Sequence, residues 1–335
     1  MTDRTENWEK VTQLLKQNQN ILLTTHIHPD GDGIGCEAAA YHFLKKMGKN
    51  PLIINDSEVP QELDFLNRDN MFARYDAAQH DEMLQSADLI FIFDVGARAR
   101  IGKLIDIIEK SKAPIVCIDH HPNNTNCFEI DIIDGQKAAT VCLVLEMFRH
   151  IAPQIIDTTI AEALYVGLLT DTGSFRFGST TSEVFQMAAE LVGYGVSPSE
   201  IYRKVYENRT PVQSRLLGMA IQNVHYELEG RLAWYIITRE MLEETGARVD
   251  DVDGFTDFIR STRGVEVVVM FLELKGNHVR LNFRSKGRYP VNTAAEKFGG
   301  GGHANAAGAM LDLPLAKAIQ NVLPEVRSVI QRKNK

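Results

Sequence analysis

The sequence predicts an α/β protein. We expect an N-terminal domain with a parallel sheet and helices on both faces, followed by a smaller α+β C-terminal domain. In the first half, short runs rich in β-branched residues alternate with helical patterns. These runs are continuously apolar, which is typical of parallel strands buried on both faces. In the last third the pattern changes to strands separated by short turns, and 335 residues are enough for two domains.

Individual elements follow from these patterns. Strands of the first domain are expected at residues 21–25, 52–55, 88–94 and 114–119. A helix is expected at 36–48, where Gly48 can end it, and the pattern from about 138 to 208 is helical. Strands of the second domain are expected at 232–238, 265–274 and 278–285, before a closing helix at 314–332. We therefore place the domains at 1–206 and 223–335, with a linker at 207–222.

Composition excludes several classes of protein. The net charge of −8 argues against a wide surface that coats nucleic acid. No apolar stretch approaches the roughly 20 residues that span a bilayer, and the polar N-terminus has no signal-peptide core. The scattered cysteines show no C-x-x-C spacing, which favours reduced thiols over a zinc site or disulfides. We expect a cytoplasmic protein without a membrane partner.

Acidic and histidine residues cluster where the predicted strands and one helix end. They are His26, Asp30, Asp32, Asp94, Asp119, His120, His121 and Asp171. Ligands of parallel α/β sheets bind at the carboxyl ends of the strands. Any one of these residues could be a turn former, a helix cap or a surface residue, and "DGDG" alone could be an ordinary turn or a calcium-loop lookalike. Their coincidence at four separate segments favours one site.

Charge repulsion indicates what this site would bind. Two like charges about 4 Å apart repel by roughly 4 kcal/mol at an effective dielectric constant of 20. The basic residues near these acids in sequence are Arg98 and Arg100, which follow Asp94. Two divalent cations would cancel the charges of four aspartates, and the mixed oxygen and imidazole set favours Mn²⁺. Two such ions about 3.5–4 Å apart form a clamp for phosphate ester hydrolysis.

The same motifs resemble those of a known family. "HIHPDGDGIG", "DVGARARIG", "IDHHPNN" and "TDTGSFRF" are similar to the four motifs of the DHH phosphoesterases. Downstream, "FRSKGRYPVNTAAEKFGGGGHANAAGA" resembles the DHH-associated C-terminal domain. Length and domain order resemble the group that degrades short RNA and dephosphorylates 3′-phosphoadenosine 5′-phosphate.

The resemblance implies roles for individual residues. One metal ion would be held by His26, Asp30 and Asp94. The other would be held by Asp32, Asp94, His120 and Asp171. Asp94 would bridge the ions and act with His121 in catalysis, with His121 facing the scissile phosphate or the leaving oxygen. The chain departs from the family pattern at Cys36 and Val95, which are not ligand positions, and His28 is not expected to be a ligand.

The second domain carries a candidate anion site. Residues 275–288 contain five basic residues and no acid, and strand alternation would send Arg280, Asn282 and Arg284 to one face. A solvated basic face is the alternative. The glycine run before His303 could be a flexible linker or a turn whose N–H groups approach a phosphate. The resemblance favours substrate binding by Arg284, Ser285, Gly300, Gly301, Gly302 and His303.

The function that follows is a two-metal phosphodiesterase. Its expected substrates are short single-stranded RNA or dinucleotides, released as nucleoside monophosphates, and phosphonucleotides such as 3′-phosphoadenosine 5′-phosphate. Alternatives are a phosphodiesterase specific for linear or cyclic dinucleotides, a RecJ-like exonuclease and a non-catalytic nucleotide-binding regulator. Phe175 and Phe177 could stack on a base or pack in the core. The sequence leaves a homodimer open.

Overall fold

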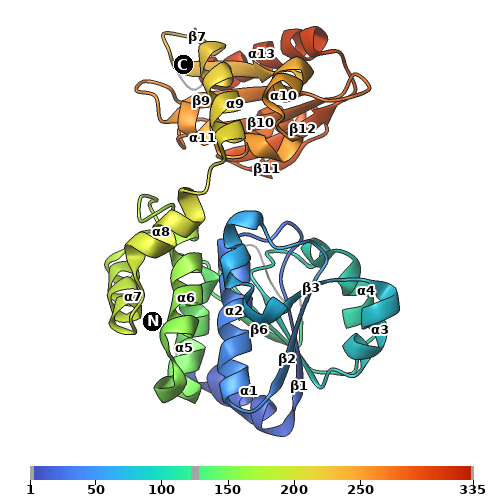
Figure 1. Cartoon of the computed structure of the whole chain (residues 1–335), viewed down its shortest axis with the longest axis vertical. Coiled ribbons are helices and arrows are strands. Elements are labelled where there is room, and N and C mark those ends of the chain that lie inside the picture. The colour runs from blue at the N-terminus through green and yellow to red at the C-terminus, as the bar shows by residue number, and fades with distance from the viewer. Residues whose placement is uncertain (1–3, 122–127, 333–335) are drawn as a thin grey trace. The chain divides into compact units, whose positions relative to one another are not determined.

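The chain folds into two compact units, residues 1–208 and 209–335, each with its own sheet and core (Figure 1). The computed structural model describes residues 4–121 and 128–332. Cys127 and the end of the "IDHHPNN" motif lie outside the described residues. The predicted fold class, a parallel α/β unit followed by a smaller α+β unit, is confirmed.

The sheet of the first unit is parallel throughout. Its strands, in chain order, are β1 (Asn20–Thr24), β2 (Asn50–Asn55), β3 (Phe72–Arg74), β4 (Leu89–Phe93), β5 (Ile115–Asp119) and β6 (Ile130–Ile133). They lie in the order β3-β2-β1-β4-β5-β6. The chain therefore reverses its direction across the sheet between β1 and β4. Such a switch point opens a crevice at the carboxyl ends of these two strands.

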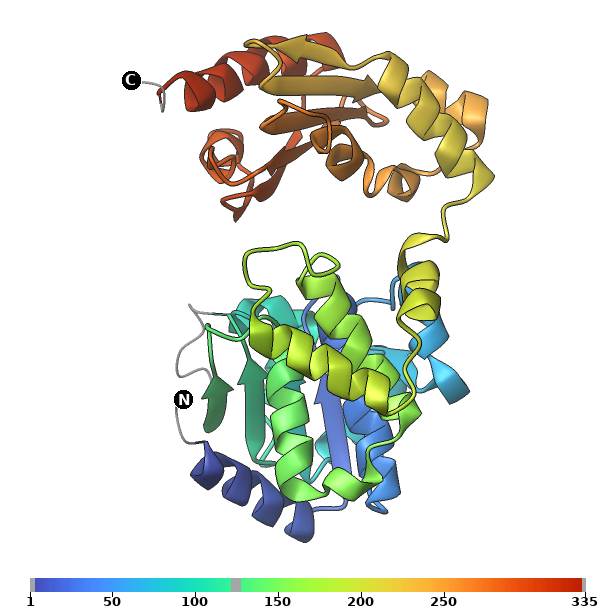
Figure 2. The same cartoon turned by 90° about the vertical axis from the view of Figure 1, so that its left-hand side faces the viewer.

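Helices cover both faces of this sheet (Figures 1 and 2). They are α1 (Thr5–Gln17), α2 (Gly31–Lys46), α3 (Ala77–Gln85), α4 (Ile105–Ile108), α5 (Thr140–Ile151), α6 (Thr158–Asp171), α7 (Ser182–Gly193) and α8 (Pro198–Tyr206). One face packs against α2 and α5, whose Phe43 and Phe148 stack at 3.9 Å between ring centroids. The other face packs against Leu84 of α3 and Ile108 of α4. Continuous apolar strands suit such a two-sided burial.

Helix α2 begins five residues earlier than the sequence pattern predicts. The side chain of Asp30 accepts hydrogen bonds from the backbone N–H groups of Asp32 and Gly33, and so caps the helix. The "DGDG" segment is therefore the first turn of a helix and not a free loop. Apolar periodicity missed this turn because its residues are glycine and aspartate.

Glycine in α2 allows α6 to approach closely. A Cβ atom on Gly35 would lie 2.6 Å from the carbonyl oxygen of Ala163, and one on Gly31 would lie 2.4 Å from the hydroxyl of Thr170. Only a residue without a side chain fits at such distances. This packing brings Asp171, the last residue of α6, beside the start of α2.

The second unit contains a mixed sheet, in the order β11-β12-β10-β9-β8-β7. Its strands are β7 (His225–Glu227), β8 (Leu232–Ile237), β9 (Val267–Glu273), β10 (Val279–Ser285), β11 (Gly301–His303) and β12 (Ala306–Leu311). Its helices are α9 (Pro211–Gln222), α10 (Arg239–Thr245), α11 (Phe255–Arg260), α12 (Asn292–Glu296) and α13 (Leu315–Arg332). None of the helices in the described residues is long and apolar enough to cross a membrane.

The segment predicted as a linker is mostly helix α9 of the second unit. A capping box at Thr210 and Gln213 starts the helix, with Pro211 at its first position. Leu216 and Leu217 are buried in a core cluster with Tyr235 and Phe255. The proline and arginines suggested a connector, but the proline marks the beginning of a helix.

The sheet has strands that sequence patterns did not reveal. β11 and β12 form from "GGH" and "AAGAML", which lack the β-branched residues that mark a strand. Gly301 and Gly302, expected in a turn, lie in edge strand β11, paired with Gly308 and Ala307. A Cβ atom on Gly300 would lie 2.1 Å from the carbonyl oxygen of Gly308, so this run is glycine because two backbones meet.

Packing of α9 makes a testable prediction. Leu216→Ala removes a fully buried side chain, and we expect it to lower the free energy of unfolding of the second unit by about 2–5 kcal/mol. Ile221→Ala, at a position of the same helix that is 43% exposed, is the matched control and should change it by less than about 0.5 kcal/mol. Urea unfolding followed by Trp234 fluorescence, in a Trp8→Phe background, measures both. Equal stability of the two variants would mean that α9 is a linker after all.

Candidate metal centre

The predicted site lies at the carboxyl edge of the first sheet, around the switch point between β1 and β4. His26 and Asp94 follow these neighbouring strands, and His120 follows β5. The start of α2 contributes Asp32, and the end of α6 contributes Asp171. Four segments far apart in the sequence therefore meet, as the rule for parallel sheets predicts.

A first group surrounds the imidazole of His26. Its Nε2 atom lies 3.6 Å from Oδ2 of Asp94 and 3.8 Å from Oδ2 of Asp30. Nδ1 lies 2.8 Å from the carbonyl oxygen of Ile27, to which an N–H on that atom would donate. Nε2 is buried and has no hydrogen-bond partner. A buried nitrogen without a partner, facing two carboxylates, is a fitting ligand for a cation.

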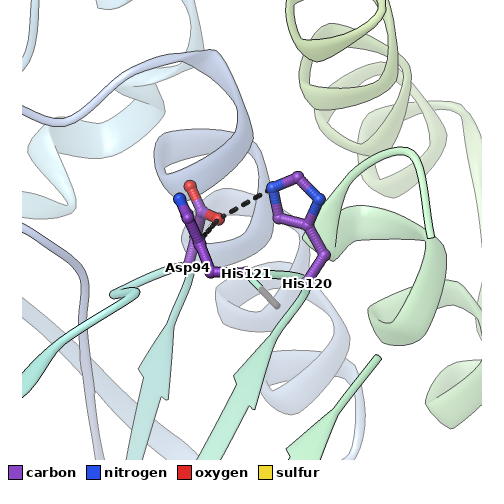
Figure 3. Close-up of side chains that lie close together, drawn as sticks. All are labelled: Asp94, His120 and His121. Carbon is purple, nitrogen blue, oxygen red and sulfur yellow. Dashed lines mark ion pairs between the residues drawn. The ribbon is translucent and has the colours of Figure 1, made fainter. Parts of the chain in front are cut away.

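A second group surrounds the imidazole of His120. Its Nε2 atom lies 3.2 Å from Oδ2 of Asp171 and 3.9 Å from Oδ2 of Asp32. The same atom lies 3.6 Å from Oδ1 of Asp94 (Figure 3). Asp94 thus turns one oxygen to each group. This is the arrangement expected of a carboxylate that bridges two ions.

Three sets of candidate ligand atoms lie within 4.8 Å of one another: those of His26, Asp30 and Asp94, those of Asp32, His120 and Asp171, and those of Asp94, His120 and His121. The structure therefore brings together all six residues predicted to bind metal, which are His26, Asp30, Asp32, Asp94, His120 and Asp171. His28, not expected to be a ligand, is in none of the groups found among the described residues. Two imidazoles and four carboxylates are donors that suit a first-row divalent ion. Their role as ligands stays a prediction.

The charges at the site shift the pKa values of its members. Burial, reinforced by the nearby carboxylates of Asp94 and Asp171, raises the pKa of Asp32 well above its usual range. Burial also raises the pKa of Asp171, to about 7. Burial alone lowers the pKa of His26, but the nearby carboxylates of Asp30 and Asp94 outweigh it and raise the value to about 10. The raised pKa of Asp32 favours its protonated form unless a cation compensates its charge.

His121 has a different environment. Its Nδ1 lies 2.7 Å from Oδ1 of Asp119, and this hydrogen bond raises the pKa of His121. Asp119 is fully buried and also accepts hydrogen bonds from the backbone N–H groups of His121 and Gly96. Although Nδ1 is also 3.5 Å from Oδ1 of Asp94 (Figure 3), it is occupied by Asp119. Asp119 is therefore an orienting residue for His121.

Thr140 is a residue that sequence reasoning missed. Its hydroxyl donates to Oδ1 of Asp94 at 2.9 Å and accepts from the backbone N–H of His120 at 3.3 Å. Its backbone N–H and that of Val141 donate to the two oxygens of Asp32, so the N-terminus of α5 faces this buried carboxylate. The one sequence feature that could have pointed to Thr140 is its position at the start of a predicted helix.

Arg100 is the basic residue of the motifs that reaches the site. Its Nη2 atom lies 3.0 Å from Nδ1 of His26. Arg98 instead pairs with Glu109 in an exposed position, 2.7 Å away. One guanidinium cannot neutralise four carboxylates, so divalent cations are still the expected source of the missing positive charge.

Asp94 has a strained backbone. Its φ angle is 54°, in the left-handed region that non-glycine residues rarely adopt. Its backbone N–H donates to the carbonyl oxygen of Ile118 in β5. Such strain costs about 1–3 kcal/mol and is found at functional sites, where the surrounding structure enforces it.

The predicted substrate residues of the second domain lie in the second unit. Arg280 and Arg284 alternate with buried residues along β10, as predicted. The basic stretch contains no acid, but acidic residues from other segments lie beside it. Asp257 of α11 lies 3.6 Å from Arg284, and Asp253 lies 3.9 Å from Arg280. Ser285 is buried, whereas Gly301, Gly302 and His303 are exposed.

Comparison with known proteins now identifies the family. Residues 20–168 match the N-terminal domain of the DHH family, and residues 234–332 match the DHHA1 domain. The chain is 33% identical over 330 residues to the bifunctional oligoribonuclease and PAP phosphatase NrnA of Thermus thermophilus, covering 97% of this chain and 96% of that one. The chain belongs to the DHH family. The resemblance seen in its motifs is confirmed, and phosphoesterase activity is the activity of this family.

One further relative and two solved structures are also similar to this chain. The NrnA of Bacillus subtilis is 28% identical and covers 87% of this chain and 89% of its own length. An exopolyphosphatase-related protein of Bacteroides fragilis superposes with a TM-score of 0.94 at 26% identity, over 100% of both chains. RecJ of Thermus thermophilus, solved in complex with Mn²⁺, shares the fold, with a TM-score of 0.56 and 13% identity over 100% of this chain and 55% of RecJ.

The contacts of Thr140 predict an effect on metal affinity. Thr140→Val keeps the shape but removes the hydroxyl that fixes Asp94 and His120. Loss of such an orienting hydrogen bond typically weakens metal binding about 10- to 100-fold. Thr140→Ser retains the hydroxyl and should bind metal like the native protein. Calorimetric titration of the metal-free protein with Mn²⁺ measures the difference. Equal affinity of the Val and Ser variants would show that Thr140 does not position the ligands.

Proposed function

We propose that this DHH protein is a two-metal phosphodiesterase that hydrolyses short RNA to nucleoside monophosphates and also dephosphorylates 3′-phosphoadenosine 5′-phosphate. The observation that carries this is the pair of ligand groups joined through the two oxygens of Asp94. The substrates are supported by relatives named oligoribonuclease and PAP phosphatase that match nearly the whole chain.

Each group would hold one divalent ion. His26, Asp30 and Asp94 would bind the first, and Asp32, Asp94, His120 and Asp171 the second. Mn²⁺ is the proposed ion because it accepts both carboxylate oxygen and imidazole nitrogen. When bound, such ions activate water and stabilise negative charge on phosphoryl oxygens. The buried carboxylates and the hydroxyl of Thr140 fix the ligand positions before substrate arrives.

His121 would act on the substrate. Asp119 accepts a hydrogen bond from Nδ1–H and thereby fixes the ring, which leaves Nε2 for the scissile phosphate or the leaving oxygen. The raised pKa favours the protonated imidazole, the form that a group donating a proton to a leaving oxygen requires.

Residues of the second unit would hold a further phosphate of the substrate. Arg284 supplies a guanidinium suited to bidentate contact with phosphate. Ser285, Gly300, Gly301, Gly302 and His303 are the other proposed contacts. The acid beside Arg284 is Asp257, so an incoming phosphate would compete with this carboxylate for the guanidinium.

Product analysis tests the proposal. RNAs of two to about twenty nucleotides, labelled at one end, and 3′-phosphoadenosine 5′-phosphate are incubated with protein and Mn²⁺. We expect mononucleotides from the short RNAs and AMP from the bisphosphonucleoside. Asp94→Ala should abolish both activities, because one residue serves both ions. Activity of Asp94→Ala near the native level would overturn the bridging role, and hydrolysis of dinucleotides alone would favour a dinucleotide-specific enzyme.

The proposed role of Arg284 makes a separate prediction. Arg284→Ala should raise KM for short RNA tenfold or more, because charge-assisted hydrogen bonds are worth about 1.5–3 kcal/mol. Hydrolysis of bis-p-nitrophenyl phosphate, which has no second phosphate, should change less than twofold. Arg280→Ala is the matched control, because it removes a guanidinium from the same face of β10 that is not among the proposed phosphate contacts. Equal loss on both substrates would mean that Arg284 is structural or acts in the chemistry.

A further inference from the structure

Exposed aromatic side chains gather around the loop that follows Asp171. Among the described residues six phenylalanines or tyrosines are exposed, and four of them form what we call the aromatic face: Phe177, Phe185, Tyr202 and Tyr206. Their exposed fractions are 50%, 56%, 44% and 40%. Single exposed aromatics are common, but four beside one loop indicate an interaction surface.

Phe177 and Phe185 are tied to this loop by direct packing. The ring of Phe177 lies so close to Gly173 that a Cβ atom there would come within 2.4 Å of it, and Gly173 has a φ angle of 56°. Phe185, on α7, stacks on Phe175 with 5.6 Å between ring centroids. Gly173 is only two residues beyond Asp171, so the face begins beside a proposed metal ligand.

The tyrosines extend the face along α8. The side chain of Tyr206 lies near that of Ser174 of the loop, and Tyr202 lies one turn away with 5.0 Å between the ring centroids. Arg176 of the loop is a basic residue close enough to Tyr206 to affect its pKa. Aromatic rings combined with basic residues are typical of surfaces that bind single-stranded nucleic acid.

The loop is held in shape. Ser174 and Phe175 have φ angles of 59° and 63°, in the left-handed region. Nε of Arg176 donates to the carbonyl oxygen of Gly173 at 2.6 Å. The N–H of Phe175 donates to the hydroxyl of Thr172, which is fully buried. Non-glycine residues with such backbone angles cost energy, so the surrounding contacts must hold the loop in the conformation that presents its rings.

We propose that the aromatic face binds the unpaired bases of an oligonucleotide whose scissile phosphate lies at the metal centre. This rests on the proposed function. Base–aromatic stacking is worth about 1–3 kcal/mol per base and does not depend on base identity. The face therefore selects single strands without selecting sequence. A mononucleotide substrate has one base and gains less from the face than a longer RNA.

Two alanine variants test this binding. Phe185→Ala and Tyr202→Ala each remove one ring of the aromatic face. Phe177 and Tyr206, which contact the loop, are unchanged in both variants. For an RNA of five nucleotides we expect KM to rise about tenfold in each, which corresponds to about 1.4 kcal/mol, with kcat changed less than twofold. For 3′-phosphoadenosine 5′-phosphate KM should change less than twofold.

Matched variants separate stacking from folding. Tyr202→Phe keeps the ring and should retain native KM, whereas Tyr202→Leu keeps an apolar side chain without a ring and should behave like Tyr202→Ala. Tyr226→Ala removes an aromatic that is 54% exposed in the second unit, and it should change nothing. Thermal melting checks that every variant is folded. If Tyr202→Ala alone melted early, Tyr202→Leu would carry the test.

Several outcomes would overturn the proposal. An unchanged KM for the five-nucleotide RNA in both alanine variants would do so, as would an equal rise for the bisphosphonucleoside. Reduced self-association in sedimentation with unchanged KM would assign the face to contact between copies of the chain. If the native protein hydrolyses no RNA at all, the proposed function has failed rather than the assignment of this face alone.

Discussion

The mutual repulsion of four carboxylates at one edge of a sheet is the constraint on which the rest of this structure depends. Asp32 and Asp94 are almost entirely buried, where like charges repel more strongly than in water. The pKa values of Asp32 and Asp171 are raised accordingly. A chain that keeps such a cluster loses stability without a cation, so the cluster is explained by what it binds and not by its contribution to folding.

The fold converges on this cluster through backbone features as much as through side chains. Glycines in α2 let α6 approach, which brings Asp171 to the site. The N-terminus of α5 faces Asp32, and its first residue, Thr140, holds Asp94 and His120. Asp94 itself adopts a strained φ angle. Each of these features costs conformational freedom or stability and fixes the position of a candidate ligand. This is expected where the geometry of a site, and not folding, constrains the sequence.

The sequence predicted that the candidate ligands lie close together, because their positions follow from topology. Residues at the ends of parallel strands must meet at one edge, so His26, Asp94 and His120 could be placed without coordinates. Side-chain contacts between distant segments could not be predicted from the sequence. Nothing in the local pattern pairs Asp257 with Arg284 or directs Thr140 to Asp94. α9 and β12 were missed because a proline at a helix start resembles a connector, and alanine and glycine give no strand signal.

A net charge of −8 is compatible with RNA as a substrate because the proposed contacts are local. A protein that coats nucleic acid needs many phosphate contacts, and its affinity falls steeply with salt. Stacking on aromatic rings carries no charge and loses little when salt is added. In the basic stretch of the second unit, Arg284 lies near Asp257 and Arg280 lies near Asp253, so carboxylates already offset part of its charge. The proposed recognition, by aromatic rings and one arginine, therefore needs no wide basic surface, and it is compatible with the negative net charge of the chain.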